Sequence, residues 1–137
     1  MSERLPDDNF AAESTLLRLR ELRGGLLRLH KTLLDSERAR YEEAAGRVSS
    51  GELLQLVINH EQFAWLRSIS ELIVSIDELL YTDEAVKAYE AESRIEKARA
   101  LLKPSEEGDD FGRKYFAALQ HDPDAVFAHR EVAKILK

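Results

Sequence analysis

Charged side chains lie inside the apolar stripes of two predicted helices. Glu37 and His30 fall within the leucine stripe of the first helix, and Glu61 falls within the apolar stripe of the second, one turn before Trp65. If these helices form an antiparallel hairpin that turns near Val48, Glu37 and Glu61 lie at about the same level, with His30 about two turns further along. A buried carboxylate or imidazole is costly unless it is paired. These side chains are therefore the candidate functional residues.

Three interpretations of this group of four side chains remain open. The first is a structural ion-pair network, in which Arg40 and Arg99 neutralise the carboxylates and help to fix the register of the helices. The second is ordinary exposure to solvent through a gap in the bundle. The third is a ligand or metal pocket, in which either carboxylate is a ligand or a general base, the imidazole carries a proton and the indole is a stacking wall.

The chain lacks the other motifs that commonly carry chemistry. The segment His60–Ala64 begins like the H-E-x-x-H zinc-protease helix, but Ala64 stands where the second histidine is required. No glutamate is followed by a histidine three residues on, as di-iron bundles require. There is no cysteine, no glycine-rich phosphate loop and no Gly-x-Ser-x-Gly motif. We therefore predict no catalytic residue, no metal site and no cofactor, and the sequence favours a non-enzymatic protein over an enzyme.

Length and composition bound the class of protein. The 137 residues suffice for one domain, and a hydrophobic fraction of 44% suffices for a core. With 20 basic and 26 acidic residues, the net charge of −6 argues against nucleic-acid binding. The chain has no signal-like segment and no run of about 20 apolar residues, so we expect an acidic cytoplasmic protein without a membrane span.

Apolar residues recur at helical spacing and no useful strand pattern occurs, so the predicted class is all-α. We expect one domain over residues 1–137, with a flexible segment over 1–9 and an antiparallel bundle of three long helices followed by two short ones. The predicted helices span about 10–46, 51–81, 83–103, 111–120 and 123–136. Ser49 and Glu52 form a capping box, Thr82 precedes the third helix, and Asp122 precedes a proline at the first helical position. Whether Gly24 and Gly25 break the first helix stays open.

The second predicted helix is apolar on two opposite sides. Leu54, Ile58, Trp65, Ile69, Leu72, Ile76 and Leu79 share one face, whereas Leu56, Phe63 and Val74 share the opposite face. A helix that is apolar on two sides is buried on two sides. This helix is therefore either central in the bundle or packed against a second copy of the chain, and we expect a dimer interface at Leu56, Phe63 and Val74.

The sequence favours a non-enzymatic protein-interaction or scaffold module that acts as a homo-oligomer, most simply a homodimer. The alternative is a helical bundle that binds a small ligand or a metal through His30, Glu37, Glu61 and Trp65. A third hypothesis is an unidentified acidic protein partner, because basic residues share one flank of the first helix. These residues are Arg20, Arg23, Lys31 and Arg38.

Overall fold

The computed structural model describes residues 9–137, and each regular element in that range is a helix apart from one isolated β-bridge. The predicted all-α class is confirmed. The elements are α1 (Glu13–Ala45), α2 (Ser50–Asn59), the 3₁₀ helix η2 (Glu61–Leu66), α3 (Arg67–Leu80), α4 (Ala88–Leu101), α5 (Asp110–His121) and α6 (Pro123–Leu136). Of the three predicted long helices, only the first is observed as one long helix, α1. The flexible segment expected over 1–9 falls almost wholly outside the described residues.

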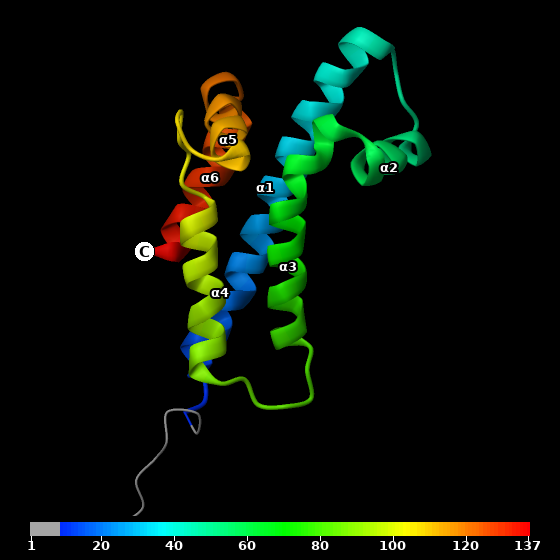
Figure 1. The fold of residues 1–137 in the computed structure, drawn as a ribbon. Helices are drawn as coiled ribbons and strands as arrows, with labels where there is room; N and C mark the ends of the chain where they lie inside the picture. Colours follow the sequence, from blue (N-terminus) through cyan, green and yellow to red (C-terminus); the bar gives the residue numbers. More distant parts are fainter. Residues whose placement is uncertain (1–8) are drawn as a thin grey trace, which may run out of the picture.

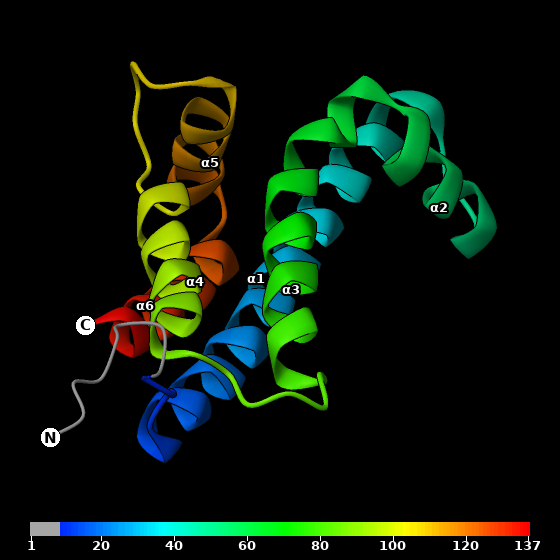
Figure 2. The ribbon, with the colours of Figure 1, turned by 60° about the horizontal axis from the view of Figure 1, so that its bottom comes forward.

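The long helix α1 is the element on which the others pack. It contacts α3, α4, α6 and η2, while α5 and α6 lie on the side of the molecule away from α2 (Figure 1; Figure 2). The leucine stripe predicted from the sequence is its buried face, and its members are Leu19, Leu22, Leu26, Leu29 and Leu33. Gly24 and Gly25 do not interrupt the helix, which is continuous from Glu13 to Ala45.

Gly25 lies at a close contact between α1 and α6. A Cβ atom at Gly25 would lie 3.0 Å from Cγ2 of Val132 and 3.4 Å from Cδ1 of Ile135. The end of α6 is then held by two arginines, because Arg18 Nε donates to the Ile135 carbonyl and Arg99 Nε donates to the Leu136 carbonyl, each at 2.8 Å. These bonds satisfy carbonyls that the last turn of a helix leaves without partners.

The second predicted helix, 51–81, is wrong as a single helix. The chain leaves helical geometry at His60, where φ is −90° and ψ is 132°, and the Nδ1 atom of His60 accepts from the Gln62 amide at 3.1 Å. This local cap starts η2 in a new direction, so α2 stands apart from α3 (Figure 1). The capping box that begins α2 is confirmed, since the Glu52 amide donates to Ser49 Oγ at 3.1 Å.

The third predicted helix begins five residues later than expected, at Ala88 rather than at residue 83. Thr82 Oγ1 accepts from the Glu84 amide at 3.3 Å, but this makes a local turn and does not start a helix. The residues before α4 instead pair with the chain that leads into α1. The Ala11 amide donates to the Val86 carbonyl at 2.8 Å, and the Ala88 amide donates to the Asn9 carbonyl at 2.9 Å.

The two C-terminal helices lie close to their predicted bounds. Asp122 caps α6 as expected, with its Oδ1 atom accepting from the Asp124 amide at 2.9 Å, and Pro123 is the first helical residue. Asp109 caps α5 in the same way by accepting from the Gly112 amide at 2.8 Å. Both caps are encoded locally, which explains why the sequence predicts these helices well.

Substitutions at the two adjacent glycines of α1 should have opposite effects on stability. Gly25→Leu should lower the free energy of unfolding by about 1–3 kcal/mol, because an added side chain overpacks the contact with Val132. Gly24→Ala should raise it by about 0.5–1 kcal/mol, because the nearest atom to an added Cβ is the flexible Arg28 side chain at 3.5 Å. Urea unfolding followed by circular dichroism measures both. Equal effects at the two positions would contradict the close approach at Gly25.

Candidate functional site

Glu37 is a buried carboxylate, with 9% of its side chain exposed, and it joins α1 to η2. The Gln62 side-chain amide donates to Oε2 at 2.8 Å and to the Glu37 carbonyl at 3.2 Å. The Trp65 indole N–H donates to Oε1 at 3.3 Å. The Arg40 guanidinium lies 3.6 Å from the same oxygen, and its side chain is 69% exposed. The carboxylate is therefore paired on its buried side by neutral donors and on its outer side by a cation.

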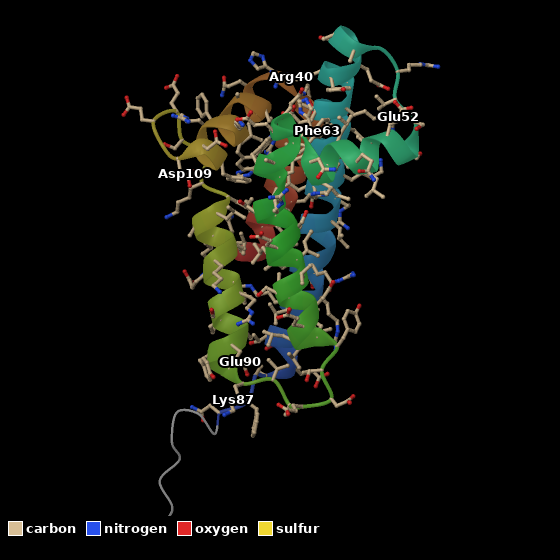
Figure 3. All side chains as sticks on the ribbon, turned by 45° about the vertical axis from the view of Figure 1, so that its right-hand side comes forward. Arg40, Glu52, Phe63, Lys87, Glu90 and Asp109 are labelled. Atoms are coloured by element: carbon tan, nitrogen blue, oxygen red, sulfur yellow. The ribbon has the colours of Figure 1, made fainter. Side chains whose placement is uncertain are left out.

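A cavity of about 290 Å³ adjoins this carboxylate, where α1 and η2 meet α5. We call it the Glu37 cavity. Apolar side chains form part of its wall, and polar groups from α1 and α5 form the rest. Its lining residues are Leu33, Ser36, Glu37, Arg40, Trp65, Ala117, Ala118 and His121. Figure 3 shows Arg40 at the end of the molecule where α1 approaches Phe63 of η2.

Two of the four candidate residues, Glu37 and Trp65, come together at this cavity, and the other two do not. Glu61 is exposed on η2, because the change of direction at His60 turns Gln62 and Trp65 toward α1. His30 lies elsewhere on α1 and pairs with α3, with its Nε2 atom 3.0 Å from Ser70 Oγ. Glu61 therefore does not share a buried cluster with Glu37, although its neighbour Gln62 contacts Glu37.

Of the two arginines proposed as partners, only Arg40 lies beside Glu37. Arg99 forms an ion pair with Glu96 and donates to the Leu136 carbonyl. The predicted ion-pair network is therefore smaller than expected. It consists of the Glu37 carboxylate, the neutral donors Gln62 and Trp65, and Arg40.

Three polar residues of the site were not predicted: Gln62, Ser36 and His121. Gln62 had a signal, because it precedes Trp65 by one turn and a helix or 3₁₀ helix brings both donors near one acceptor. Ser36 precedes Glu37 on α1 but carries no signal of its own, and His121 had none because α5 reaches α1 only through tertiary packing.

The expected interface residues have three different environments. Phe63 is 1% exposed and packs inside the core of its own chain, so it cannot belong to a surface shared by two folded copies. Leu56 is half-buried, and Val74 is 55% exposed. The expected common face of Leu56, Phe63 and Val74 depended on an unbroken helix, which the break at His60 removes.

The helix α2 carries apolar side chains that are exposed in the described part of the chain. None of its ten residues is buried, and Leu54 and Ile58 are 57% and 53% exposed. Arg67 Nη2 donates to the Ile58 carbonyl at 3.2 Å, which joins the end of α2 to the start of α3. We call Leu54, Ile58 and Val74 the α2 surface.

The basic flank of α1 is largely paired within the chain. Arg23 forms an ion pair with Asp77, Lys31 pairs with Asp35 at 2.9 Å, and Arg38 lies 3.6 Å from Glu42. Arg20 lines a groove of about 500 Å³ between α1 and α6. An acidic partner would have to compete with these pairs.

Two further findings concern the part of the chain from residue 9 onward. No three acidic, histidine or cysteine side chains there are close enough to hold one metal ion. None of its helices combines the length and apolar character needed to cross a bilayer. Comparison of the chain with known protein families, curated proteins and solved structures gave no match. Function is therefore argued from the residues themselves.

Replacing the two candidate carboxylates, Glu37 and Glu61, should give unequal effects. Glu37→Ala should lower the free energy of unfolding by about 2–4 kcal/mol, because each donor left without a partner near the core costs about 1–3 kcal/mol. Glu61→Ala is the matched control and should change it by less than about 0.5 kcal/mol, since Glu61 is exposed. Thermal or urea unfolding measures the difference, and a similar loss for both variants would contradict the assigned bonds.

The half-buried histidines His30 and His129 should make the protein less stable in mild acid. Burial lowers the pKa of His30 and of His129 from the ordinary value of 6.5, so the unfolded chain takes up protons first as the pH falls. The Nδ1 atom of His129 lies 2.6 Å from Tyr115 Oη, and burial raises the pKa of that phenol, which keeps it a neutral donor. The free energy of unfolding should therefore decrease as the pH falls below about 6.5. The His30→Gln, His129→Gln double variant should flatten this dependence, and an unchanged slope would contradict it.

Proposed function

We propose that this protein is a non-enzymatic interaction module that acts as a homodimer through the α2 surface. The observation that carries the proposal is the exposure of Leu54, Ile58 and Val74, each of which has more than half of its side chain in contact with solvent. Contiguous exposed apolar side chains are typical of protein-interaction sites, and the bond from Arg67 of α3 to the Ile58 carbonyl links α3 to the end of α2. The non-enzymatic role rests on the lack of a catalytic motif in the sequence.

The spacing along α2 supports docking of one helix against another. Gly51, Leu54 and Ile58 follow each other at intervals of three and four residues, which is the spacing of a helix-packing seam. A Cβ atom at Gly51 would meet nothing within 4 Å, so a second helix has free access at that end. The capping box at Ser49 and Glu52 holds this short helix in shape before any partner arrives.

The charges beside the α2 surface favour a second copy of the same chain. Arg67 and Glu71 are both exposed and lie one turn apart on α3, on the stripe that leads to Val74. Across a two-fold axis the same patch meets itself, so Arg67 of one copy can pair with Glu71 of the other, and the reverse. The patch then combines self-complementary charges with exposed apolar side chains.

The size of the α2 surface indicates a reversible dimer. A stable interface of standard size buries roughly 800 Å² on each partner. Three apolar side chains from two short elements supply only part of that area, so the polar neighbours must contribute the rest. We therefore expect a dimer that dissociates on dilution, in the cytoplasm and without nucleic acid, as the acidic composition favours.

Ile58→Asp should convert the dimer to a folded monomer. The new carboxylate would be buried without a partner at the centre of the interface, while the monomer should keep its fold because Ile58 is 53% exposed. Light scattering after size-exclusion chromatography should give twice the 15.6 kDa chain mass for the unchanged chain and a single chain mass for the variant.

Phe127→Asp is the matched control, because Phe127 is 67% exposed on α6 and lies outside the α2 surface. It should leave the dimer intact. A monomeric unchanged chain at high concentration would overturn the proposal, as would an Ile58→Asp variant that remains dimeric.

A further inference from the structure

We propose that the Glu37 cavity is a binding site for a small apolar α-amino acid, whose ammonium group pairs with Glu37 and whose carboxylate pairs with Arg40. This site is independent of the α2 surface and shares no residue with it. The proposal rests on the positions of two opposite charges that line the cavity. The Glu37 carboxylate is nine-tenths buried, and the Arg40 side chain is 69% exposed.

The buried carboxylate has acceptor capacity that residues 9–137 do not use. A carboxylate offers about four lone-pair positions. Gln62 occupies one at 2.8 Å and Trp65 another at 3.3 Å, whereas Arg40 at 3.6 Å lies beyond normal hydrogen-bond distance. An ammonium group has three donors and can use the remaining positions.

Arg40 supplies the complementary charge at a matching distance. Its Nη1 atom lies 3.6 Å from Oε1 of Glu37, so the cavity offers an anion and a cation close together. An α-amino acid carries its own two charges on one carbon atom. It can therefore contact both side chains with little movement of either, and the guanidinium can hold the ligand carboxylate with two parallel hydrogen bonds.

A ligand that carries only one charge fits this arrangement less well. An amine would approach Glu37 against repulsion from Arg40, and a carboxylic acid would approach Arg40 against repulsion from Glu37. A ligand with both charges offsets each repulsion by an attraction between its second charge and the other side chain.

The remaining walls and the volume define the ligand's side chain. Leu33, Trp65, Ala117 and Ala118 offer apolar surface. A volume of about 290 Å³ corresponds to about ten water molecules at roughly 30 Å³ each. This accommodates a compact aliphatic amino acid such as valine. Ser36 and His121 also line the cavity and can donate to the ligand carboxylate.

The chain contains its own reporter of occupancy. Trp65 is its only tryptophan and lines the cavity. Titration of the full chain with L-valine, followed by tryptophan fluorescence and by calorimetry, should give saturable one-to-one binding. Isobutylamine and isovalerate each keep the aliphatic group and one charge, and both should bind at least about 10-fold more weakly, since each loses a charge-assisted bond. Absence of saturable valine binding, or equal binding of the three compounds, would overturn the proposal.

Two matched variants locate the binding. Ala117→Phe adds a ring from an exposed cavity position without touching the Glu37 bonds, and it should weaken valine binding at least about 10-fold. Ala100→Phe makes the same change at an exposed position on α4 and should leave binding unchanged.

Arg40→Gln tests the contribution of the ligand carboxylate separately from that of the ammonium group. It should weaken binding of valine while leaving isobutylamine no weaker than before, because only valine has a carboxylate for Arg40 to hold. Valine binding that survives both Ala117→Phe and Arg40→Gln would show that the cavity is not the site and that Glu37 only ties η2 to α1.

Discussion

The buried carboxylate of Glu37 is the interaction on which the arrangement of this molecule depends. It accepts from Gln62 and from Trp65, and these two donors can reach one carboxylate because the chain turns into η2 immediately before them. A continuous helix through this segment would keep the axis of α2 and give η2 a different face toward α1. The same turn therefore buries Phe63 and leaves α2 standing outside the core.

A row of packed aromatic rings connects Trp65, which donates to Glu37, with the C-terminal helices α5 and α6. The Trp65 and Phe111 rings lie 5.5 Å apart, Phe111 and Tyr115 lie 5.4 Å apart, and Tyr115 and His129 lie 5.4 Å apart, measured between centroids. This row runs from η2 through α5 to α6. Since Trp65 both donates to Glu37 and begins the row, the wall of the Glu37 cavity is part of the core. Such packing would hold the indole in place before the proposed ligand binds, which would lower the cost of binding.

The sequence predicted the features that local chemistry encodes. The leucine stripe of α1, the capping box at Ser49 and the Asp122–Pro123 start of α6 each depend on residues a few positions apart. The break at His60 is different, because the apolar period continues across it and no glycine or proline marks it. The late start of α4 also depends on a distant pairing, between residues near Phe10 and Lys87.

The candidate site divides in the same way. Glu37 and Trp65 could be identified as unusual residues on an apolar stripe, but their true partners depend on the turn at His60 and on the packing of α5.

The most direct test of this account is the hydrogen exchange of the single indole N–H, followed by NMR in D₂O. We expect slow exchange in the unchanged chain and in Glu61→Ala, and much faster exchange in Glu37→Ala, because only the latter removes the acceptor. Equal exchange rates in the unchanged chain and in Glu37→Ala would contradict the account.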